Sequence, residues 1–263
     1  MKIALITGAS SGMGRQFVKK IDDENLDEIW GVGLEQELLD EVAKECKTKF
    51  RSLALDLTKQ DNLEFINSLL SEIKPDIKWL VNASGFGKFA RHDEYPIEVG
   101  LNMIDLNVKA LVYLTEVCLN YMTKGARVVE FGSVAGYQPI PYIAMYGATK
   151  AFVYSYSRAV NEEIKDRGIT ITCLTPYWTK TRFFDRAIKN KDDKNKVVTK
   201  YVCMYDAEKV INRAYKDALK GKAVSKYGFI ARAQVMLVKF LPTKFVINTW
   251  LRQQKLRKKY KNR

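Results

Sequence analysis

Tyr146 and Lys150 stand four residues apart in the segment Tyr-Gly-Ala-Thr-Lys. On a helix, side chains four residues apart share a face, so a phenol and an ammonium group would lie side by side. A free tyrosine has a pKa near ~10 and is a weak base at neutral pH, but a nearby cation favours the phenolate and lowers that pKa. We therefore expect this pair to pass a proton to or from a substrate oxygen near pH 7.

A glycine-rich segment near the N-terminus supplies a second candidate site. The apolar run Lys2–Ile6 is typical of a buried parallel strand, and the spacing of Phe17, Val18 and Ile21 predicts a helix. Between them lies Thr-Gly-Ala-Ser-Ser-Gly-Met-Gly, where glycines allow a tight turn and the free N–H groups of the helix start suit a pyrophosphate. A strand, a glycine loop and a helix in this order predict a dinucleotide site. Its expected binding residues are Gly8, Ser10, Ser11, Gly12, Met13 and Gly14.

Taken together, ordered motifs over roughly residues 1–230 resemble the short-chain dehydrogenase/reductase family. Thr7–Gly14 resembles its cofactor loop, and Pro176 resembles the proline that follows its sixth strand. Four positions match its catalytic residues in order and spacing: Asn107, Ser133, Tyr146 and Lys150. The resemblance implies an NAD(P)-dependent enzyme that interconverts a carbonyl and a secondary alcohol. It also implies further cofactor contacts from Asp56, Leu57, Asn82, Ala83, Gly85, Tyr146, Lys150, Pro176, Thr179 and Thr181.

The same resemblance implies a role for each catalytic position. Tyr146 would be the general acid/base, and Lys150 would lower its pKa and bind the nicotinamide ribose. Ser133 would orient the substrate oxygen, and Asn107 would interrupt its helix and hold a water that relays protons to Lys150.

The end of the second expected strand bears on the choice of cofactor. An acidic residue there binds the ribose of NAD, and an arginine accommodates the 2′-phosphate of NADP. The sequence has Gly33 and Leu34 at these two positions, with Glu35 next. Because Glu35 would repel a 2′-phosphate, the sequence favours NAD(H) over NADP(H).

Apolar strands that alternate with helical stretches predict an α/β fold, a Rossmann-like doubly wound parallel sheet in a single domain. The chain has 263 residues, of which 47% are hydrophobic, and contains no linker-like segment. We expect a catalytic domain over residues 1–230 and a helical extension over 231–263. The strands expected after the first are Ile29–Leu34, Ser52–Leu55, Trp79–Val81, Ala126–Phe131 and Thr170–Leu174.

An apolar, aromatic substrate pocket is expected beside the catalytic residues. The segment Phe183–Tyr205 resembles the family's mobile lid, and within it lies a charge run at Lys189–Lys196. Tyr177 stands where the family has glycine. The residues expected to contact substrate are Ser133, Tyr137, Tyr142, Tyr146, Tyr177 and Phe183. This lining suits a steroid, a fatty-acyl compound or an aromatic compound.

The C-terminal part of the sequence is apolar and then basic. Residues 235–250 are largely apolar, and residues 252–263 carry seven Lys and Arg and no acid. This pattern suits the surface of an anionic membrane, and equally a helix that packs on the core or covers an oligomer contact. Nucleic acid is not an expected partner, because no recognisable binding module accompanies the basic residues.

Other classes of function and location follow from the composition. Four cysteines without metal-ligand spacing and the single histidine, His92, argue against a zinc site. The first strand begins at Met1–Ile6, which leaves no room for a signal peptide, so we expect a cytoplasmic protein, peripheral to a membrane if the tail binds one. The resemblance implies a homodimer or tetramer. A catalytically quiet nucleotide sensor or scaffold, or a lipid-pathway protein acting at a membrane surface, are the alternatives to an enzyme.

Overall fold

The computed structural model describes residues 1–181, 183–187 and 197–256. Seven parallel strands form one sheet in the order β3-β2-β1-β4-β5-β6-β7. The strands are β1 (Lys2–Thr7), β2 (Glu28–Gly33), β3 (Lys49–Ala54), β4 (Asp76–Asn82), β5 (Arg127–Phe131), β6 (Thr170–Leu174) and β7 (Val224–Ser225). The chain order reverses direction between β1 and β4, which is where doubly wound sheets bind ligands.

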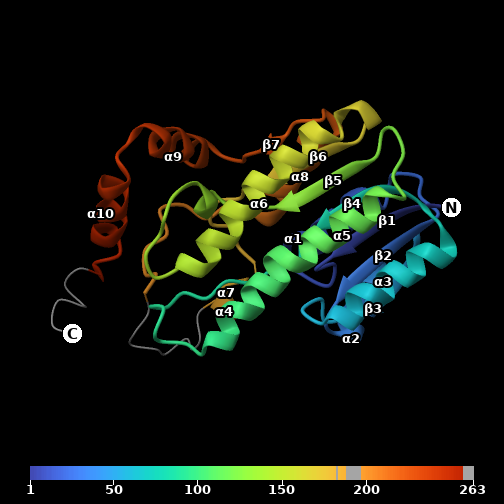
Figure 1. The fold of residues 1–263 in the computed structure, drawn as a ribbon, viewed down its shortest axis with the longest axis horizontal. Coiled ribbons are helices and arrows are strands. Elements are labelled where there is room, and N and C mark those ends of the chain that lie inside the picture. Colours follow the sequence, from blue (N-terminus) through green and yellow to red (C-terminus); the bar gives the residue numbers. More distant parts are fainter. Residues whose placement is uncertain (182, 188–196, 257–263) are drawn as a thin grey trace.

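Helices cover both faces of this sheet (Figure 1). The α-helices are α1 (Gly12–Ile21), α2 (Gln36–Glu45), α3 (Gln60–Ile73), α4 (Ile97–Ile104), α5 (Ala110–Leu119), α6 (Ala144–Glu163), α7 (Phe183–Ala187), α8 (Ala207–Leu219), α9 (Phe229–Phe240) and α10 (Thr243–Gln253). A π-helical turn, Asp105–Lys109, joins α4 to α5, and short 3₁₀ turns occupy Val134–Tyr137 and Lys165–Arg167.

Two apolar clusters hold these layers together. Leu63 and Ile66 of α3, with Leu114 of α5 and Val160 of α6, pack on one face of the sheet. Helices α1, α2 and α8 pack on the other face, through Phe17, Leu39 and Val210 among others. The expected doubly wound parallel fold is therefore confirmed.

The expected strand positions are right, but several bounds differ. The strand at Thr170–Leu174 is as expected, whereas β3 begins three residues earlier than Ser52 and β4 extends beyond Trp79–Val81 at both ends. The residues by which these strands exceed the expected bounds are mostly polar or charged, so an apolar pattern does not include them. Buried Glu28 accepts hydrogen bonds from Lys49 Nζ at 2.6 Å and Arg51 Nε at 3.1 Å, so charged residues belong to the ladder of β3.

The C-terminal extension forms α9 and α10, separated by Leu241 and Pro242. The boundary expected at residue 230 falls inside α9. Ala231 and Val235 are buried against Val134, which anchors α9 to the loop after β5. None of the described helices is long and apolar enough to cross a membrane.

Candidate active site

The glycine loop forms a tight cradle between β1 and α1. Gly8 and Gly12 have φ angles of +65° and +55°, a region that disfavours other residues. A Cβ atom on Gly14 would lie 2.1 Å from the carbonyl oxygen of Gly8, so only glycine lets α1 begin this close to the strand end. The N-terminus of α1 is thereby open to an anionic ligand, as a dinucleotide pyrophosphate requires.

The segment after β4 closes against this cradle. Ser84 N–H donates to Thr7 Oγ1 at 3.0 Å, and a Cβ on Gly8 would lie 3.0 Å from the backbone of Ala83 and Ser84. A Cβ on Gly85 would lie 2.9 Å from Asn107 Oδ1 and 3.5 Å from Lys150 Nζ. Gly85 therefore leaves the space in which the asparagine and the lysine approach each other.

Asn107 lies in the π-helical turn between α4 and α5, so the expected interruption of its helix is confirmed. Its amide is buried and fully engaged. Oδ1 accepts from Phe86 N–H at 3.0 Å, while Nδ2 donates to Phe86 O at 2.9 Å and to Thr149 Oγ1 at 3.1 Å. Asn107 thus fixes the segment after β4 to helix α6 beside Lys150. The water relay expected of it remains a prediction.

Ser133, Tyr146 and Lys150 come together where β5 ends and α6 begins. The Ser133 hydroxyl accepts from Ala135 N–H at 3.1 Å and so starts the 3₁₀ turn 134–137. A Cβ on Gly136 would lie 2.6 Å from Lys150 O, so glycine lets this turn lie directly on α6. Lys150 Nζ donates to Phe131 O at 2.6 Å and lies 5.7 Å from the centroid of the Tyr146 ring.

The protonation states of this pair differ from the sequence expectation. Burial raises the pKa of Tyr146 to about 12, and the Ser133 hydroxyl opposes that shift. Burial lowers the pKa of Lys150 to about 8, against the attraction of Cys173 and Glu130. The expected lowering of the tyrosine pKa by Lys150 is therefore not found in this structure. At neutral pH Tyr146 holds its proton and is set up to donate it.

The residues expected at the cofactor fall into two groups. Asp56, Thr179, Thr181 and Pro176 lie at carboxyl ends of strands, and a Cβ on Gly12 would lie 3.6 Å from Thr181 Cβ. Asp56 Oδ1 accepts from the backbone and hydroxyl of Thr58 at 3.0 and 2.7 Å. Glu35 is exposed and forms the N-cap of α2.

The side chains of Asn82 and Leu57 point elsewhere, into the core. Leu57 packs among buried apolar residues. Asn82 Nδ2 donates to Thr115 Oγ1 at 3.1 Å and to Glu130 Oε1 at 3.2 Å. The cofactor contacts expected of these two residues stay predictions. Asn82 has the role of joining β4, β5 and α5.

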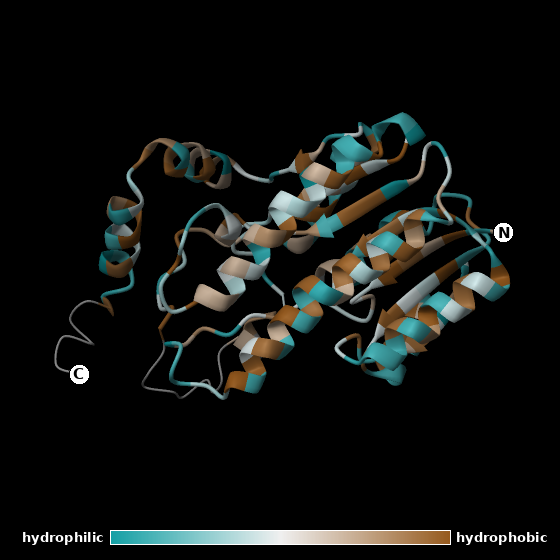
Figure 2. Cartoon of the chain, in the orientation of Figure 1, coloured by the Kyte–Doolittle hydropathy of each residue, from teal (hydrophilic) through white to brown (hydrophobic). Residues whose placement is uncertain are grey.

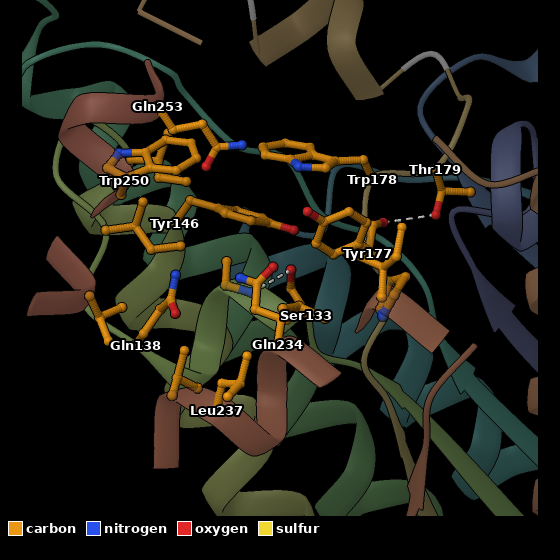
Figure 3. Close-up of a pocket in the computed structure, with 18 of the residues that line it drawn as sticks. Ser133, Gln138, Tyr146, Tyr177, Trp178, Thr179, Gln234, Leu237, Trp250 and Gln253 are labelled. Carbon is orange, nitrogen blue, oxygen red and sulfur yellow. Dashed lines mark hydrogen bonds between the residues drawn. The ribbon is translucent and has the colours of Figure 1, made fainter. Parts of the chain in front are cut away.

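A cavity of about 450 Å³ opens beside Tyr146. Ser133, Tyr146 and Tyr177, three of the expected substrate residues, line it (Figure 3). Phe183, a fourth, belongs to the same lining. The ring of Phe183 lies 5.3 Å from that of Tyr146, centroid to centroid, and covers it. Met13 of the glycine loop also reaches this lining, so the cofactor cradle and the cavity are continuous.

Helices α9 and α10 complete the wall of this cavity. Gln234 and Leu237 of α9, with Trp250 and Gln253 of α10, face the same space as Tyr146 (Figure 3). Trp250 Nε1 donates to Pro141 O at 3.0 Å and fixes α10 to the loop before α6. The C-terminal extension is thus part of the candidate substrate site.

The residue that follows α10, Gln254, holds a part of the expected lid. Gln254 Oε1 accepts from the backbone N–H of Thr199 and Lys200 at 2.9 and 3.0 Å, and its Nε2 donates to Lys200 O at 2.9 Å. Of the expected lid, residues 188–196 lie outside the described part of the chain, and so does the whole charge run Lys189–Lys196.

Two expected substrate residues do not line the cavity. Tyr137 packs against Tyr154, with ring centroids 4.4 Å apart, and beneath Lys226. Tyr142 has a φ of +69° and packs in the apolar cluster around Ile143. The sequence missed Gln138, Trp178 and the residues of α9 and α10. The positions of α9 and α10 depend on tertiary packing, and no fixed spacing to a motif could have found them.

Comparison with known proteins agrees with this arrangement. The family model described as short chain dehydrogenase matches residues 2–192. Sulfoacetaldehyde reductase 2 of Chromohalobacter salexigens is 32% identical over 188 residues, 69% of this chain and 74% of the relative. Very-long-chain 3-oxoacyl-CoA reductase of Macaca fascicularis is 29% identical over 192 residues, 68% of this chain and 60% of the relative.

A solved structure shares the fold. The short-chain dehydrogenase from Sphingobium yanoikuyae in complex with NADPH superposes with a TM-score of 0.74, at 23% identity, over 92% of this chain and 97% of that one. Structures of the same fold are solved with NADPH and with NAD. The chain belongs to the short-chain dehydrogenase family. It is therefore an NAD(P)-dependent oxidoreductase.

Proposed function

We propose that this protein reduces a carbonyl group on an apolar substrate, and oxidises the corresponding alcohol in reverse, with Tyr146 as the general acid/base. The observation that carries the proposal is the position of Tyr146 and Ser133 at one end of a cavity whose remaining wall is chiefly apolar and aromatic. A bound nicotinamide supplies or accepts the hydride at the substrate carbon.

The protein's own residues then manage the proton. Ser133 Oγ orients the substrate oxygen, and Tyr146 gives that oxygen its proton as the carbonyl becomes an alkoxide. The tyrosinate formed lies beside Lys150, whose charge stabilises it. The glycine loop would hold the pyrophosphate and Lys150 the ribose, while Thr179 and Thr181 would contact the carboxamide and pyrophosphate.

The cavity also suggests the class of substrate. Phe89, Trp178, Phe183 and Phe184 contact one another at ring-centroid distances between 5.8 and 6.4 Å and make its aromatic wall. Gln138 and Gln234 are polar groups within this lining, and Gln138 Oε1 is buried and has no hydrogen-bond partner among the described residues. A fatty-acyl, steroid or aromatic compound with a hydrogen-bond donor besides its reacting group would fill the space and satisfy that oxygen.

NAD(H) is the proposed cofactor. Strand β2 ends at Gly33, and the residues that follow, Leu34 and Glu35, offer no cation for a 2′-phosphate. A Cβ on Gly33 would lie 3.1 Å from Ser10 Oγ, so the space next to the adenosine end of the cradle is occupied by a neutral hydroxyl.

A parallel titration with NADH and NADPH, followed by quenching of the four tryptophans, tests the cofactor, and a carbonyl screen with the tighter binder tests the reaction. We expect tighter binding of NADH and turnover of apolar ketones or 3-oxoacyl compounds. Binding of neither dinucleotide would favour the alternative of a quiet sensor or scaffold, which the close approach of Ser133, Tyr146 and Lys150 argues against.

A further inference from the structure

Helix α9 has an apolar surface that is largely exposed in the described protein. Phe229, Met236 and Phe240 are 84%, 65% and 79% exposed. They follow a helical spacing and lie away from Ala231 and Val235, which face the core. Figure 2 shows α9 and α10 at the end of the molecule opposite α2 and α3, with hydrophobic residues on both helices. Apolar surface of this kind on a soluble fold marks an interaction site.

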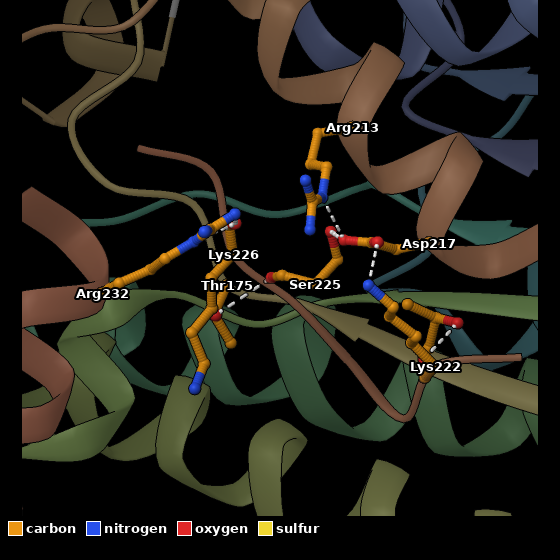
Figure 4. A network of polar contacts seen from close by, with 8 residues as sticks. Thr175, Arg213, Asp217, Lys222, Ser225, Lys226 and Arg232 are labelled. Carbon is orange, nitrogen blue, oxygen red and sulfur yellow. Dashed lines mark hydrogen bonds and ion pairs between the residues drawn. The ribbon is translucent and has the colours of Figure 1, made fainter. Parts of the chain in front are cut away.

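Cations flank this surface without compensating acids. Lys226, Arg232 and Lys239 line one shallow hollow together with Met236 and Phe240. Arg232 reaches from α9 toward Lys226 and donates to its carbonyl oxygen at 3.4 Å (Figure 4). Within the described residues, none of these three cations forms an ion pair with a carboxylate. The repulsion of Lys239, Arg158 and Arg232 adds to burial in lowering the pKa of Lys226.

The one acid in the hollow is already neutralised. Asp217 pairs with Arg213 Nε at 2.7 Å and with Lys222 Nζ at 2.9 Å, and it also accepts from Ser225 Oγ at 2.9 Å (Figure 4). After Asp217 every charged residue of the sequence is basic, since residues 218–263 contain 13 Lys and Arg and no Asp or Glu. Nearly all of the net charge of +14 therefore comes from the last part of the chain.

We propose that the α9 face, made of Phe229, Arg232, Met236, Lys239 and Phe240, docks on an anionic membrane surface. The three apolar side chains would enter the acyl boundary, and the two cations, Arg232 and Lys239, would meet lipid phosphates. A second copy of this chain is disfavoured as occupant, because two such faces would bring only positive charges together. The cytoplasmic leaflet has the negative potential that this face requires.

Docking through the α9 face would bring the opening of the cavity close to the membrane. Phe229 and Leu237 of α9 and Phe245 of α10 line the cavity and are also exposed, so its rim lies on the α9 side of the molecule. A substrate dissolved in the bilayer would enter without crossing water. This consequence rests on the proposed function, whereas the docking does not.

Flotation of the full-length protein with vesicles, without cofactor or substrate, tests the docking independently of activity. We expect binding to phosphatidylcholine vesicles that contain phosphatidylserine, weak binding to pure phosphatidylcholine, and weaker binding at higher salt. R232Q/K239Q should lower the partition coefficient about five-fold per charge removed. M236S/F240S should lower it at least ten-fold, since both side chains lose their burial in the lipid.

Matched controls lie at the opposite end of the molecule. F65S removes an exposed aromatic side chain from α3, and K44Q/K59Q removes two exposed lysines near α2 and α3. Both should float like the unaltered protein. Equal flotation of M236S/F240S and F65S would overturn the proposal. So would equal binding to neutral and anionic vesicles, or a fall in molecular mass by light scattering in M236S/F240S, which would make the face a contact between copies.

Discussion

Tyr146 holds the proton on which the proposed reaction depends. Tyr146→Phe removes only the hydroxyl and keeps the ring that packs on Phe183. Because loss of a general acid costs about 10²–10⁴-fold in rate, we expect kcat for carbonyl reduction to fall by at least about 10²-fold. Affinity for the dinucleotide, measured by tryptophan quenching, should stay within about two-fold. Turnover near the wild-type rate would rule out this tyrosine as the proton donor.

Lys150 should give the reaction a pH dependence near its own pKa of about 8. The lysine is charged below that pH, and its charge stabilises the tyrosinate that forms when Tyr146 donates. As the pH rises through about 8, the charge is lost and kcat/KM for reduction should fall. Stopped assays between pH 6 and 10 at saturating cofactor measure this. Lys150→Arg keeps a charge over this whole range. Whatever the activity of this variant, its kcat/KM should therefore not change with pH between 6 and 10.

Single residues show where sequence reasoning succeeds. The positions of the glycine loop, Ser133, Tyr146 and Lys150 could be predicted because these residue types stand at fixed spacing, and the structure brings the last three together. Their catalytic roles stay predictions. Tyr137 could not be separated from Tyr177 in this way. Both are tyrosines that follow strands, and only packing places the ring of Tyr137 against Tyr154 and that of Tyr177 in the cavity. The rise in the pKa of Tyr146 could not be predicted from the sequence either, because burial is a property of the folded chain.

Strand β5 carries a buried acid, Glu130, three residues before Ser133. Glu130 Oε1 accepts from Thr115 Oγ1 at 2.8 Å, and its Oε2 has no partner in the part of the chain that the structure describes. Burial raises the pKa of Glu130 to about 7. An unfolded glutamate ionises near 4.5. Between these two pH values the folded protein binds more protons than the unfolded chain, so the free energy of unfolding falls as the pH rises.

Glu130→Gln removes this ionisation and keeps an oxygen that can accept from Thr115. Urea unfolding at pH 5 and at pH 8 should show the wild type losing stability relative to the variant, on the order of 2 kcal/mol. The difference should develop between about pH 4.5 and 7. Parallel pH curves for the two proteins would show that Glu130 is ionised in the folded state throughout this range.

The elements themselves were predictable to different degrees. Central strands such as β1 and β6 are short apolar runs, and their bounds could be predicted closely. Strand β7 has two residues, which pair with Cys173 and Leu174 of β6. A strand this short has no sequence pattern of its own and could not be predicted. The break between α9 and α10 follows from Pro242, yet the direction of α10 depends on Trp250 and Gln254 contacting distant segments.

At the scale of the whole molecule, a second apolar surface lies on α4. Ile97, Leu101 and Ile104 are exposed and share one side of this helix, which contacts α6. The helices that carry Asn107 and Tyr146 are those through which we propose that the protein forms a homodimer. Leu101→Glu should convert a species of twice 30.2 kDa or more into one of 30.2 kDa in light scattering. Phe65→Glu on α3 is the control, and a monomeric wild type would contradict the proposal.

The division of the cavity wall between early and late parts of the sequence has an evolutionary consequence. The dinucleotide cradle and the proton-transfer groups lie before residue 182, whereas α9 and α10 supply much of the wall that a substrate would touch. We therefore expect substitutions in residues 229–256 to change which substrate is accepted while the dinucleotide cradle and Tyr146 keep their positions. Exchange of that segment between relatives would be a direct way to alter specificity.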